Sequence, residues 1–422
     1  MTDTLETRDP GEREAALMAA LPAQLRAAMA LPAMARRLGR IDADSVTTRV
    51  ALAQLPVTRK HELLQCQQAE RGGDVFAGFS ALGWNAQRAL RPARRVFQSP
   101  GPIYEPEGLA ADYWRMARAM RAAGFIAGDL VHNSFSYHLT PGAWMMECGA
   151  HALGCTVFPG GVGNTELQLQ AAEHLRPDAY VGTPSFLRIL LEKAADAGIK
   201  LPSLKKALVS GEAFPPSLRN WLRERGVEAY QAYATADVGA VAYETAAREG
   251  LVVDEGVIVE IVRPGTGDCV PDGEVGEVVV TVFNPDYPLV RFGTGDMSAV
   301  LAGHCPTGRS NTRIKGWLGR ADQTAKVRGM FVYPGQVAEV LKRHPGLTRA
   351  RLVVEGEMAN DRLSLHVEIP NDSSAVTLSA ALLEAIAHSV RDVTKLRADI
   401  VPAPPGSLPN DGKVIDDKRS YA

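Results

Sequence analysis

Several features are missing from this 422-residue sequence, and each absence excludes a class of protein. No uncharged apolar run reaches the roughly 18 residues that a membrane-spanning helix needs. The five cysteines are dispersed without a C-x-x-C pair, so there is no zinc-site signature. We expect them to be reduced thiols in a cytoplasmic protein. The opening residues, MTDTLETRDPGEREAAL, are charged, and we expect no secretory signal there.

An excess of charge of one sign is also missing. The formal net charge is -2, which argues against a nucleic acid or a membrane surface as the main partner. The apolar share of 46% and the charged share of 22% are those of a globular protein. A chain of this length can form two or three domains.

The predicted order of elements indicates an α/β protein. Residues 12–64 carry Ala- and Leu-rich segments typical of helices, and we expect a helical part over residues 1–95. From about residue 112, apolar runs of strand length alternate with helical runs. This alternation predicts βαβ crossovers and a mostly parallel sheet, flanked by helices, over residues 96–245.

Two further parts are predicted after this sheet. Residues 250–302 alternate β-branched and polar residues around the turn-rich segment GTGDCVPDG, which predicts a β-ribbon or small barrel. Residues 323–422 predict a small α+β body, with two short strands around Arg328 and a helix that begins at Pro334. A later helix is expected to open at Thr377 or Ser379.

Several motifs follow one another along the chain: SGEA at 210–213, YATAD at 233–237, PLVRFGTGD at 288–296, GRAD at 319–322, KVRG at 326–329 and GSLPNDGK at 406–413. Together with the run HNSFSYHLTPGAW and the segment LPVTRK, they resemble the phenylacetate-CoA ligase family of adenylate-forming enzymes. The resemblance covers the chain from about Leu55 to Arg419. It implies a large N-terminal domain at residues 1–320 and a small mobile C-terminal domain at 323–422, with a hinge at Asp322.

The resemblance also implies an activity and its cofactors. Enzymes of this kind activate a carboxylic acid with ATP and Mg²⁺ as an acyl-AMP and then transfer the acyl group to CoA. An aryl or small acyl acid is the expected substrate, and a homodimer is the expected assembly. The implied nucleotide-binding residues are Ser99, Gly101, Ser210, Gly211, Glu212, Ala213, Tyr233, Thr235, Asp296 and Arg320. A carboxylate such as Asp296 suits a ribose because its two oxygens can accept from both hydroxyls.

The remaining site residues are also carried over by motif position. Asp237 would hold Mg²⁺, since it keeps a hard oxygen ligand where the family has glutamate. The implied catalytic residues are Lys413, His138 and Arg328, and Lys413 would steady charge on the phosphate. The implied acyl-pocket residues are Phe135, Tyr137 and Gly161. On residue type alone, Phe135 and Tyr137 would better suit the core of a buried strand.

One segment departs from the family pattern. Where the family has a Ser-, Thr- and Gly-rich phosphate loop, this chain has SPGPIYEPEG, which retains only Ser99 and Gly101. Pro100 and Pro102 remove two backbone donors, and two glutamates follow them. Two alternatives therefore stay open: an enzyme that transfers an already activated acyl group, and a non-catalytic protein that binds the acyl group or nucleotide.

Overall fold

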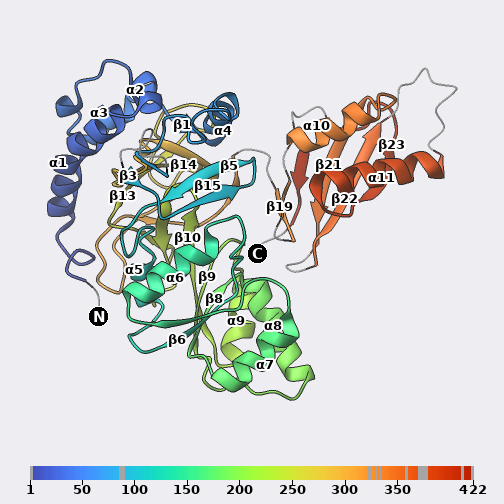
Figure 1. The fold of residues 1–422 in the computed structure, drawn as a ribbon, viewed down its shortest axis with the longest axis horizontal. Coiled ribbons are helices and arrows are strands. Elements are labelled where there is room, and N and C mark those ends of the chain that lie inside the picture. The colour runs from blue at the N-terminus through green and yellow to red at the C-terminus, as the bar shows by residue number, and fades with distance from the viewer. Residues whose placement is uncertain are drawn as a thin grey trace. The chain divides into compact units, whose positions relative to one another are not determined.

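We describe the fold from a computed structural model. It describes residues 3–84, 91–321, 325–328, 330–332, 334–356, 360–368, 379–409 and 413–419. The chain divides into two compact units, Met1–Ala321 and Asp322–Ala422. The predicted hinge residue Asp322 lies outside the described residues. Each unit is described by itself (Figure 1).

A nine-stranded sheet forms the centre of the first unit. Five neighbouring strands run parallel, in the order β10 (Glu228–Thr235), β9 (Lys206–Val209), β8 (Ala179–Gly182), β6 (Leu130–Asn133) and β7 (Thr156–Pro159). Antiparallel strands extend the sheet beyond β10: β11 (Gly239–Tyr243), β12 (Leu251–Val253), β17 (Arg313–Ile314) and β16 (Val300–Leu301). The parallel half confirms the predicted α/β class.

Helices connect the parallel strands, as crossovers require. They are α6 (Gly142–Ala152), α7 (Thr165–Leu175), α8 (Pro184–Asp196) and α9 (Pro216–Glu224), and α5 (Met116–Ala122) precedes β6. The Asp112 carboxylate accepts hydrogen bonds from the backbone N–H groups of Met116 and Ala117. The segment that was expected to be helical from Asp112 therefore begins its helix at Met116, and Asp112 satisfies the first-turn donors.

A second sheet lies in the same unit. It has the order β1 (Thr58–Arg59), β15 (Phe292–Ser298), β14 (Gly276–Val282) and β13 (Val257–Val262), and β18 (Gly319–Arg320) pairs with β15. Apolar residues of these strands pack with those of the N-terminal helices in one core. These helices are α1 (Pro10–Met29), α2 (Pro32–Leu38), η1 (Ala43–Ser45), α3 (Arg49–Ala53) and α4 (Lys60–Ala69). The predicted β-ribbon thus supplies the strands of a shared sheet.

The segment that replaces a phosphate loop forms a β-hairpin. Its strands are β4 (Arg95–Ser99) and β5 (Ile103–Glu107), and they pair along their whole length. Gln67 on α4 holds β5 through both backbone groups of Tyr104, at 2.8 and 2.9 Å. The backbone N–H of Tyr104 is therefore already bonded. A further short pair, β2 (Leu82–Gly83) and β3 (Arg91–Pro92), belongs to the same unit.

The second unit is a four-stranded sheet with two helices and a strand pair. The sheet order is β23 (Asp399–Ala403), β22 (Arg362–Glu368), β21 (Arg349–Glu355) and β24 (Ile415–Asp417). The pair is β19 (Ala325–Val327) and β20 (Met330–Val332), and the helices are α10 (Pro334–Arg343) and α11 (Ala380–Thr394). Of the two predicted caps, Ser379 is correct, since its side chain accepts from Leu382.

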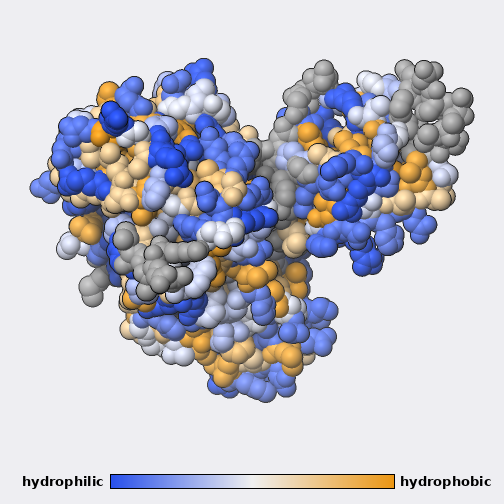
Figure 2. Space-filling model, turned by 45° about the horizontal axis from the view of Figure 1, so that its top comes forward, coloured by the Kyte–Doolittle hydropathy of each residue, from blue (hydrophilic) through white to orange (hydrophobic). Residues whose placement is uncertain are grey.

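On the face shown in Figure 2, apolar residues form separate patches among hydrophilic ones. Within the described part of the chain, no single helix is long and apolar enough to cross a membrane. Helices α1 and α2 pass that test only as a pair, by length and composition, and the pair is bent by 117° at its break.

Candidate active site

The carboxyl ends of the parallel strands carry most of the predicted site. Residues 134–138 follow β6, the loop 160–163 follows β7, residues 210–213 follow β9, and Tyr233 and Thr235 lie at the end of β10. Parallel neighbours end at the same edge of a sheet, so these loops gather at one edge. The structure therefore brings together motifs that are separated along the sequence.

Asp296 on β15 receives hydrogen bonds from three side chains. The Tyr233 hydroxyl donates to Oδ2 at 2.9 Å, and Arg320 and Trp317 donate to Oδ1 at 2.9 and 3.1 Å. Burial and then the charge of Asp296 raise the pKa of Tyr233 well above its ordinary value, so its hydroxyl remains a donor. Two predicted nucleotide residues, Tyr233 and Arg320, thus contact a third. Trp317 was not predicted.

The loop after β9 is held against the neighbouring strand and helix. The backbone N–H of Ser210 donates to the Gly182 carbonyl at 3.1 Å. The Glu212 carboxylate accepts a 2.6 Å hydrogen bond from Ser185, in the first turn of α8. Gly211 has a φ of 81°, a left-handed conformation that favours glycine. Ala213 lies half-buried beside them, and the Thr235 hydroxyl accepts from the Val238 N–H.

The predicted acyl-pocket residues also meet. The backbone N–H of Gly161 donates to the Asn133 carbonyl at 3.0 Å, which joins the loop after β7 to the end of β6. A β-carbon at Gly161 would lie 3.9 Å from the Tyr137 ring. The Phe135 ring lies against Gly142, at the start of α6. Phe135 and Tyr137 are both half-buried rather than sealed in the core.

Tyr137 is fixed by polar and aromatic contacts. Its hydroxyl donates to Glu147 at 2.7 Å and accepts from Asn133 at 3.0 Å. Its ring meets Trp144 edge to face, with centroids 5.0 Å apart, and the Arg95 guanidinium lies 3.8 Å over the Trp144 ring. Burial, followed by the contact with Glu147, raises the pKa of Tyr137. The rings of Tyr137 and Trp144 therefore form an aromatic surface at this edge of the sheet, which we call the aromatic wall.

Two buried side chains that were not predicted hold the glycine loop. Gln168 on α7 donates from Nε2 to the carbonyl oxygens of Gly161 and Gly163, at 2.9 and 2.6 Å. Its Oε1 accepts from His132 Nε2 at 2.7 Å, and burial lowers the pKa of His132. A β-carbon at Gly160 would come within 2.6 Å of Gln168 Oε1, so a side chain at that position would displace Gln168. Sequence periodicity alone does not reveal such a contact.

A buried group of charges lies around Lys60 at the start of α4. Lys60 Nζ lies 2.8 Å from Asp237 Oδ2, in the turn after β10, and Lys60 also feels the charge of Glu105 on β5. Burial lowers the pKa of Lys60, but the two carboxylates outweigh burial and the net shift is upward. Burial and then the charge of Asp237 raise the pKa of Glu105. Lys60 belongs to the LPVTRK segment. The resemblance of this segment to the family is the only feature of the sequence that points to Lys60.

The two glutamates of the hairpin face different surroundings. Glu107 accepts hydrogen bonds from Arg95 at 2.8 and 3.0 Å and lies 3.6 Å from Arg94. Glu105 has no such arginine partner. Burial and the charge of Asp237 raise its pKa, and the nearby buried Ser99 only partly offsets this rise. Gly101 lies in the turn with a φ of 155°.

The remaining predicted residues are His138, in the loop after β6, and two residues of the second unit. His138 is exposed, and its backbone N–H donates to Ser136. In the second unit, Arg328 has a φ of 48° and donates to Asp361 through its backbone and its guanidinium, at 3.0 and 2.7 Å. Lys413 is exposed just before β24.

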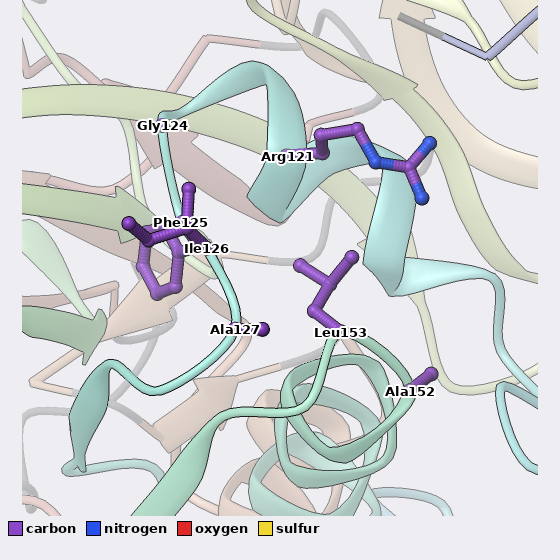
Figure 3. Close-up of a pocket in the computed structure, with 7 residues that line it drawn as sticks. All are labelled: Arg121, Gly124, Phe125, Ile126, Ala127, Ala152 and Leu153. Atoms are coloured by element: carbon purple, nitrogen blue, oxygen red, sulfur yellow. The ribbon is translucent and has the colours of Figure 1, made fainter. Parts of the chain in front are cut away.

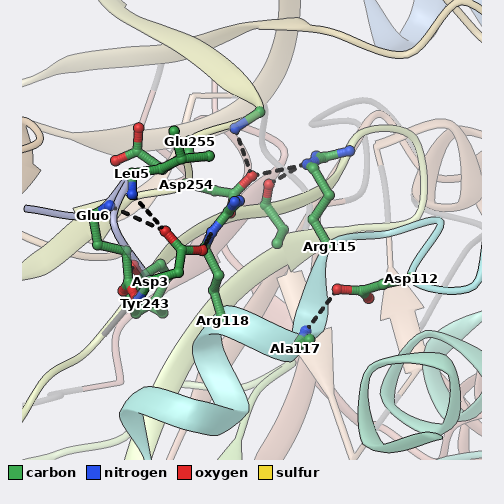
Figure 4. Close-up of polar contacts among 12 residues, drawn as sticks. Asp3, Leu5, Glu6, Asp112, Arg115, Ala117, Arg118, Tyr243, Asp254 and Glu255 are labelled. Atoms are coloured by element: carbon green, nitrogen blue, oxygen red, sulfur yellow. Dashed lines mark hydrogen bonds and ion pairs between the residues drawn. The ribbon is translucent and has the colours of Figure 1, made fainter. Parts of the chain in front are cut away.

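The N-terminal segment is held against the rest of the first unit by hydrogen bonds and ion pairs that were not predicted (Figure 4). Glu6 is 1% exposed, and its Oε1 accepts from Tyr243 and Arg309, each at 2.6 Å. Nearby, Asp3 accepts from Arg118 at 2.7 Å. These contacts hold the N-terminal segment against the end of β11. They lie apart from the carboxyl edge of the parallel strands.

A surface hollow of about 420 Å³ lies away from the predicted site. It is lined by Arg121, Gly124, Phe125, Ile126, Ala127, Ala152 and Leu153 (Figure 3). These residues precede β6 and β7, at the edge opposite to the loops described above. The hollow carries no part of the candidate site.

Comparison with known proteins identifies the class. Residues 110–282 match the AMP-binding enzyme family and residues 329–419 match the AMP-binding enzyme C-terminal domain. The structure is similar to that of a 2-hydroxyisobutyryl-CoA ligase in complex with 2-HIB-AMP and CoA, with a TM-score of 0.84 and 24% identity over 99% of this chain and 92% of that one. The fold is thus that of the adenylate-forming CoA ligases.

Relatives narrow this class to a family. The chain is 32% identical to the phenylacetate-coenzyme A ligase of Aromatoleum evansii over 376 residues, 85% of this chain and 82% of that protein. It is 29% identical to that of Escherichia coli (strain K12) over 320 residues, 72% of each chain. The chain belongs to the phenylacetate-CoA ligase family of AMP-binding enzymes, as its motifs predicted.

Proposed function

We propose that the protein is an AMP-forming acid–CoA ligase for an aryl or small acyl acid. The observation that carries this proposal is the direct contact of Tyr233 and Arg320 with Asp296. Tyr233 ends β10 at the same edge of the sheet at which the loop with Tyr137 follows β6. A nucleotide site and half-buried aromatic residues at one sheet edge suit an acid that is joined to AMP. Two related enzymes act on phenylacetate and 2-hydroxyisobutyrate by name, and both acids fall in this class.

The proposed reaction has two steps. In the first, a carboxylate oxygen of the acid attacks the α-phosphorus of ATP, and the bond to the β-phosphate breaks to release pyrophosphate. In the second, the CoA sulfur attacks the acyl carbon, its proton is lost to solvent, and AMP leaves with the bonding electron pair. Asp296 would bind the ribose and Tyr137, Phe135 and Gly161 would line the acyl pocket.

Several residues are assigned roles as part of this proposal. The loop 210–213 would hold the adenine, Thr235 the α-phosphate, and Ser99 with Gly101 the outer phosphates. We propose that the second unit turns about Asp322 between the steps, with Lys413 acting in the first step and Arg328 in the second. His138, which is exposed beside the acyl pocket, would face the acyl group during transfer.

Mg²⁺ would be held by Asp237, and it would neutralise charge on the phosphates during the first step. The residues fit this ion, because Asp237 Oδ1 is buried and makes no hydrogen bond to the described residues. We further propose a cytoplasmic homodimer without a nucleic-acid or membrane partner. Light scattering should give twice the chain mass of 45.3 kDa.

The test separates the two steps. The purified full chain is incubated with ATP, Mg²⁺, CoA and phenylacetate or 2-hydroxyisobutyrate, and pyrophosphate and acyl-CoA are measured. We expect both products with at least one acid. A parallel sample receives synthetic phenylacetyl-AMP and CoA without ATP, which requires only the second step.

A second candidate function is favoured by the β4–β5 hairpin. Pro100 and Pro102 provide no donors, and the N–H of Tyr104 is already bonded to Gln67, so the hairpin offers few donors to outer phosphates. An enzyme of this kind would transfer an acyl group that another enzyme has activated. Acyl-CoA formed from phenylacetyl-AMP but never from ATP would establish this function in place of the first. Absence of both reactions and of AMP binding would leave a non-catalytic protein.

A further inference from the structure

Four buried oxygen atoms around Lys60 make no hydrogen bond to any described residue. They are both carboxylate oxygens of Glu105, Oδ1 of Asp237 and the hydroxyl of Tyr287. The exposed fractions of these residues are 1%, 6% and 2%. Buried polar atoms are almost always paired in folded proteins, so a cluster of unpaired oxygens points to a water or an ion that completes it.

The basic groups near this cluster already have other partners. Lys60 bonds to Asp237 at 2.8 Å, and the Arg320 guanidinium is bonded to Asp296. Burial and then the charges of Asp237 and Glu105 raise the pKa of Tyr287. Among the described residues, Glu105 therefore has no hydrogen-bonded or ion-paired cation.

Glu107 provides an internal comparison. It is buried on the same strand, two residues after Glu105, yet Arg94 and Arg95 neutralise it. The unpaired carboxylate is thus a property of the Glu105 position and not of the hairpin as a whole. Ionising a carboxyl group that is buried without a partner costs several kcal/mol, and a bound cation would offset this cost.

We propose that Glu105 and Asp237 together bind one hard divalent cation, which takes the place of the Lys60 ammonium beside Asp237. This inference rests on the proposed function, to which it adds a second protein ligand for the metal. Two carboxylates are a typical protein contribution to a Mg²⁺ site, because the ion keeps waters and takes further oxygens from substrate phosphates. Glu105 thereby gains a role in the hairpin that replaces the phosphate loop.

The experiment measures metal binding directly. Mn²⁺ is titrated into the purified full chain, with and without AMP, and free Mn²⁺ is followed by electron paramagnetic resonance. We expect Glu105→Gln and Asp237→Asn each to weaken Mn²⁺ binding by about tenfold or more, since each removes one ligand charge. Glu107→Gln is the matched control, and its Mn²⁺ affinity should stay within about twofold of the wild type.

A further variant tests the exchange with lysine. Lys60→Met removes the competing ammonium, and we expect it to tighten Mn²⁺ binding by about tenfold. Glu105→Gln removes an unpaired buried charge without changing the side-chain shape, so we expect the fold to be retained, as circular dichroism would verify. If only Asp237→Asn weakens binding, or if the wild type binds no Mn²⁺ in either condition, the proposal is wrong. Acyl-CoA formation is measured in a separate assay. A negative result for Mn²⁺ binding would therefore overturn this proposal without deciding the proposed ligase activity.

Discussion

The hydroxyl of Tyr233 donates a 2.9 Å hydrogen bond to the Asp296 carboxylate, and this contact joins the two largest sheets of the first unit. Tyr233 ends β10 of the nine-stranded sheet, whereas Asp296 lies on β15 of the other sheet. Arg320 and Trp317 occupy the second oxygen of the same carboxylate. Asp296 is therefore held in one orientation before any nucleotide arrives.

This arrangement predicts unequal effects on AMP binding. Tyr233→Phe removes one hydrogen bond of about 1 to 2 kcal/mol, so we expect AMP affinity to fall by roughly 5- to 30-fold. Asp296→Asn points amide donors at Arg320 and should abolish measurable binding. Calorimetry with AMP checks both variants. Unchanged affinity in Asp296→Asn would remove this carboxylate from the nucleotide site.

Gln168 supports the glycine loop without being placed in contact with the acid. Gln168→Ala deletes the donors to Gly161 and Gly163, and each lost bond is worth about 1 kcal/mol. We expect the KM for the acid to rise by roughly tenfold while the KM for ATP stays within about twofold. Steady-state kinetics with each substrate varied in turn gives this split. A similar rise for both substrates would mean general loosening of the fold.

The buried imidazole of His132 predicts a pH dependence of stability. Burial lowers the pKa of His132 in the folded state, although its bond to Gln168 works against this shift. The folded state therefore binds fewer protons, and its stabilisation is present above the ordinary pKa of 6.5 and is lost as pH falls below it. Between pH 6.5 and the lower pKa of folded His132, the free energy of unfolding decreases by at most about 1.4 kcal/mol for each pH unit.

We expect the decline in the free energy of unfolding below pH 6.5 to be shallower in His132→Leu than in the wild type. The variant should also be less stable at pH 7, because Gln168 loses its donor. Urea denaturation at several pH values measures both effects. His304→Asn changes an exposed histidine and should leave the slope unaltered. Parallel curves for His132→Leu and the wild type would contradict the assignment.

Replacing Glu6 should show how much its buried contacts contribute to the stability of the fold. Glu6→Ala leaves the buried groups of Arg309 and Tyr243 without their acceptor, and breaking such a pair costs about 3 to 5 kcal/mol. Thermal unfolding should show a clear decrease in Tm. Glu12→Ala alters an exposed carboxylate in the first turn of α1 and should cost less than about 1 kcal/mol. Equal Tm values for the two variants would exclude this role for Glu6.

Helices, strands and caps that depend on residues close together along the sequence could be predicted from the sequence. Apolar periodicity indicates the strands and helices of the parallel sheet, and the Ser379 cap follows from a side chain that bonds to a backbone group three residues away. The motifs and their order were sufficient to predict the family, because each motif is a short run of residues that is visible in the sequence itself.

Only the tertiary structure decided which side chains meet. Lys60 and Asp237 are 177 positions apart, and neither periodicity nor composition indicates that they form an ion pair beside Glu105. The sequence determined that SPGPIYEPEG departs from a phosphate loop, since proline lacks a backbone donor wherever it lies. Glu105 and Glu107 share one face of β5, and only the packing around the hairpin decided that Glu107 and not Glu105 meets arginines. Long-range contacts of this kind arise from the packing of whole elements, which a single sequence does not reveal.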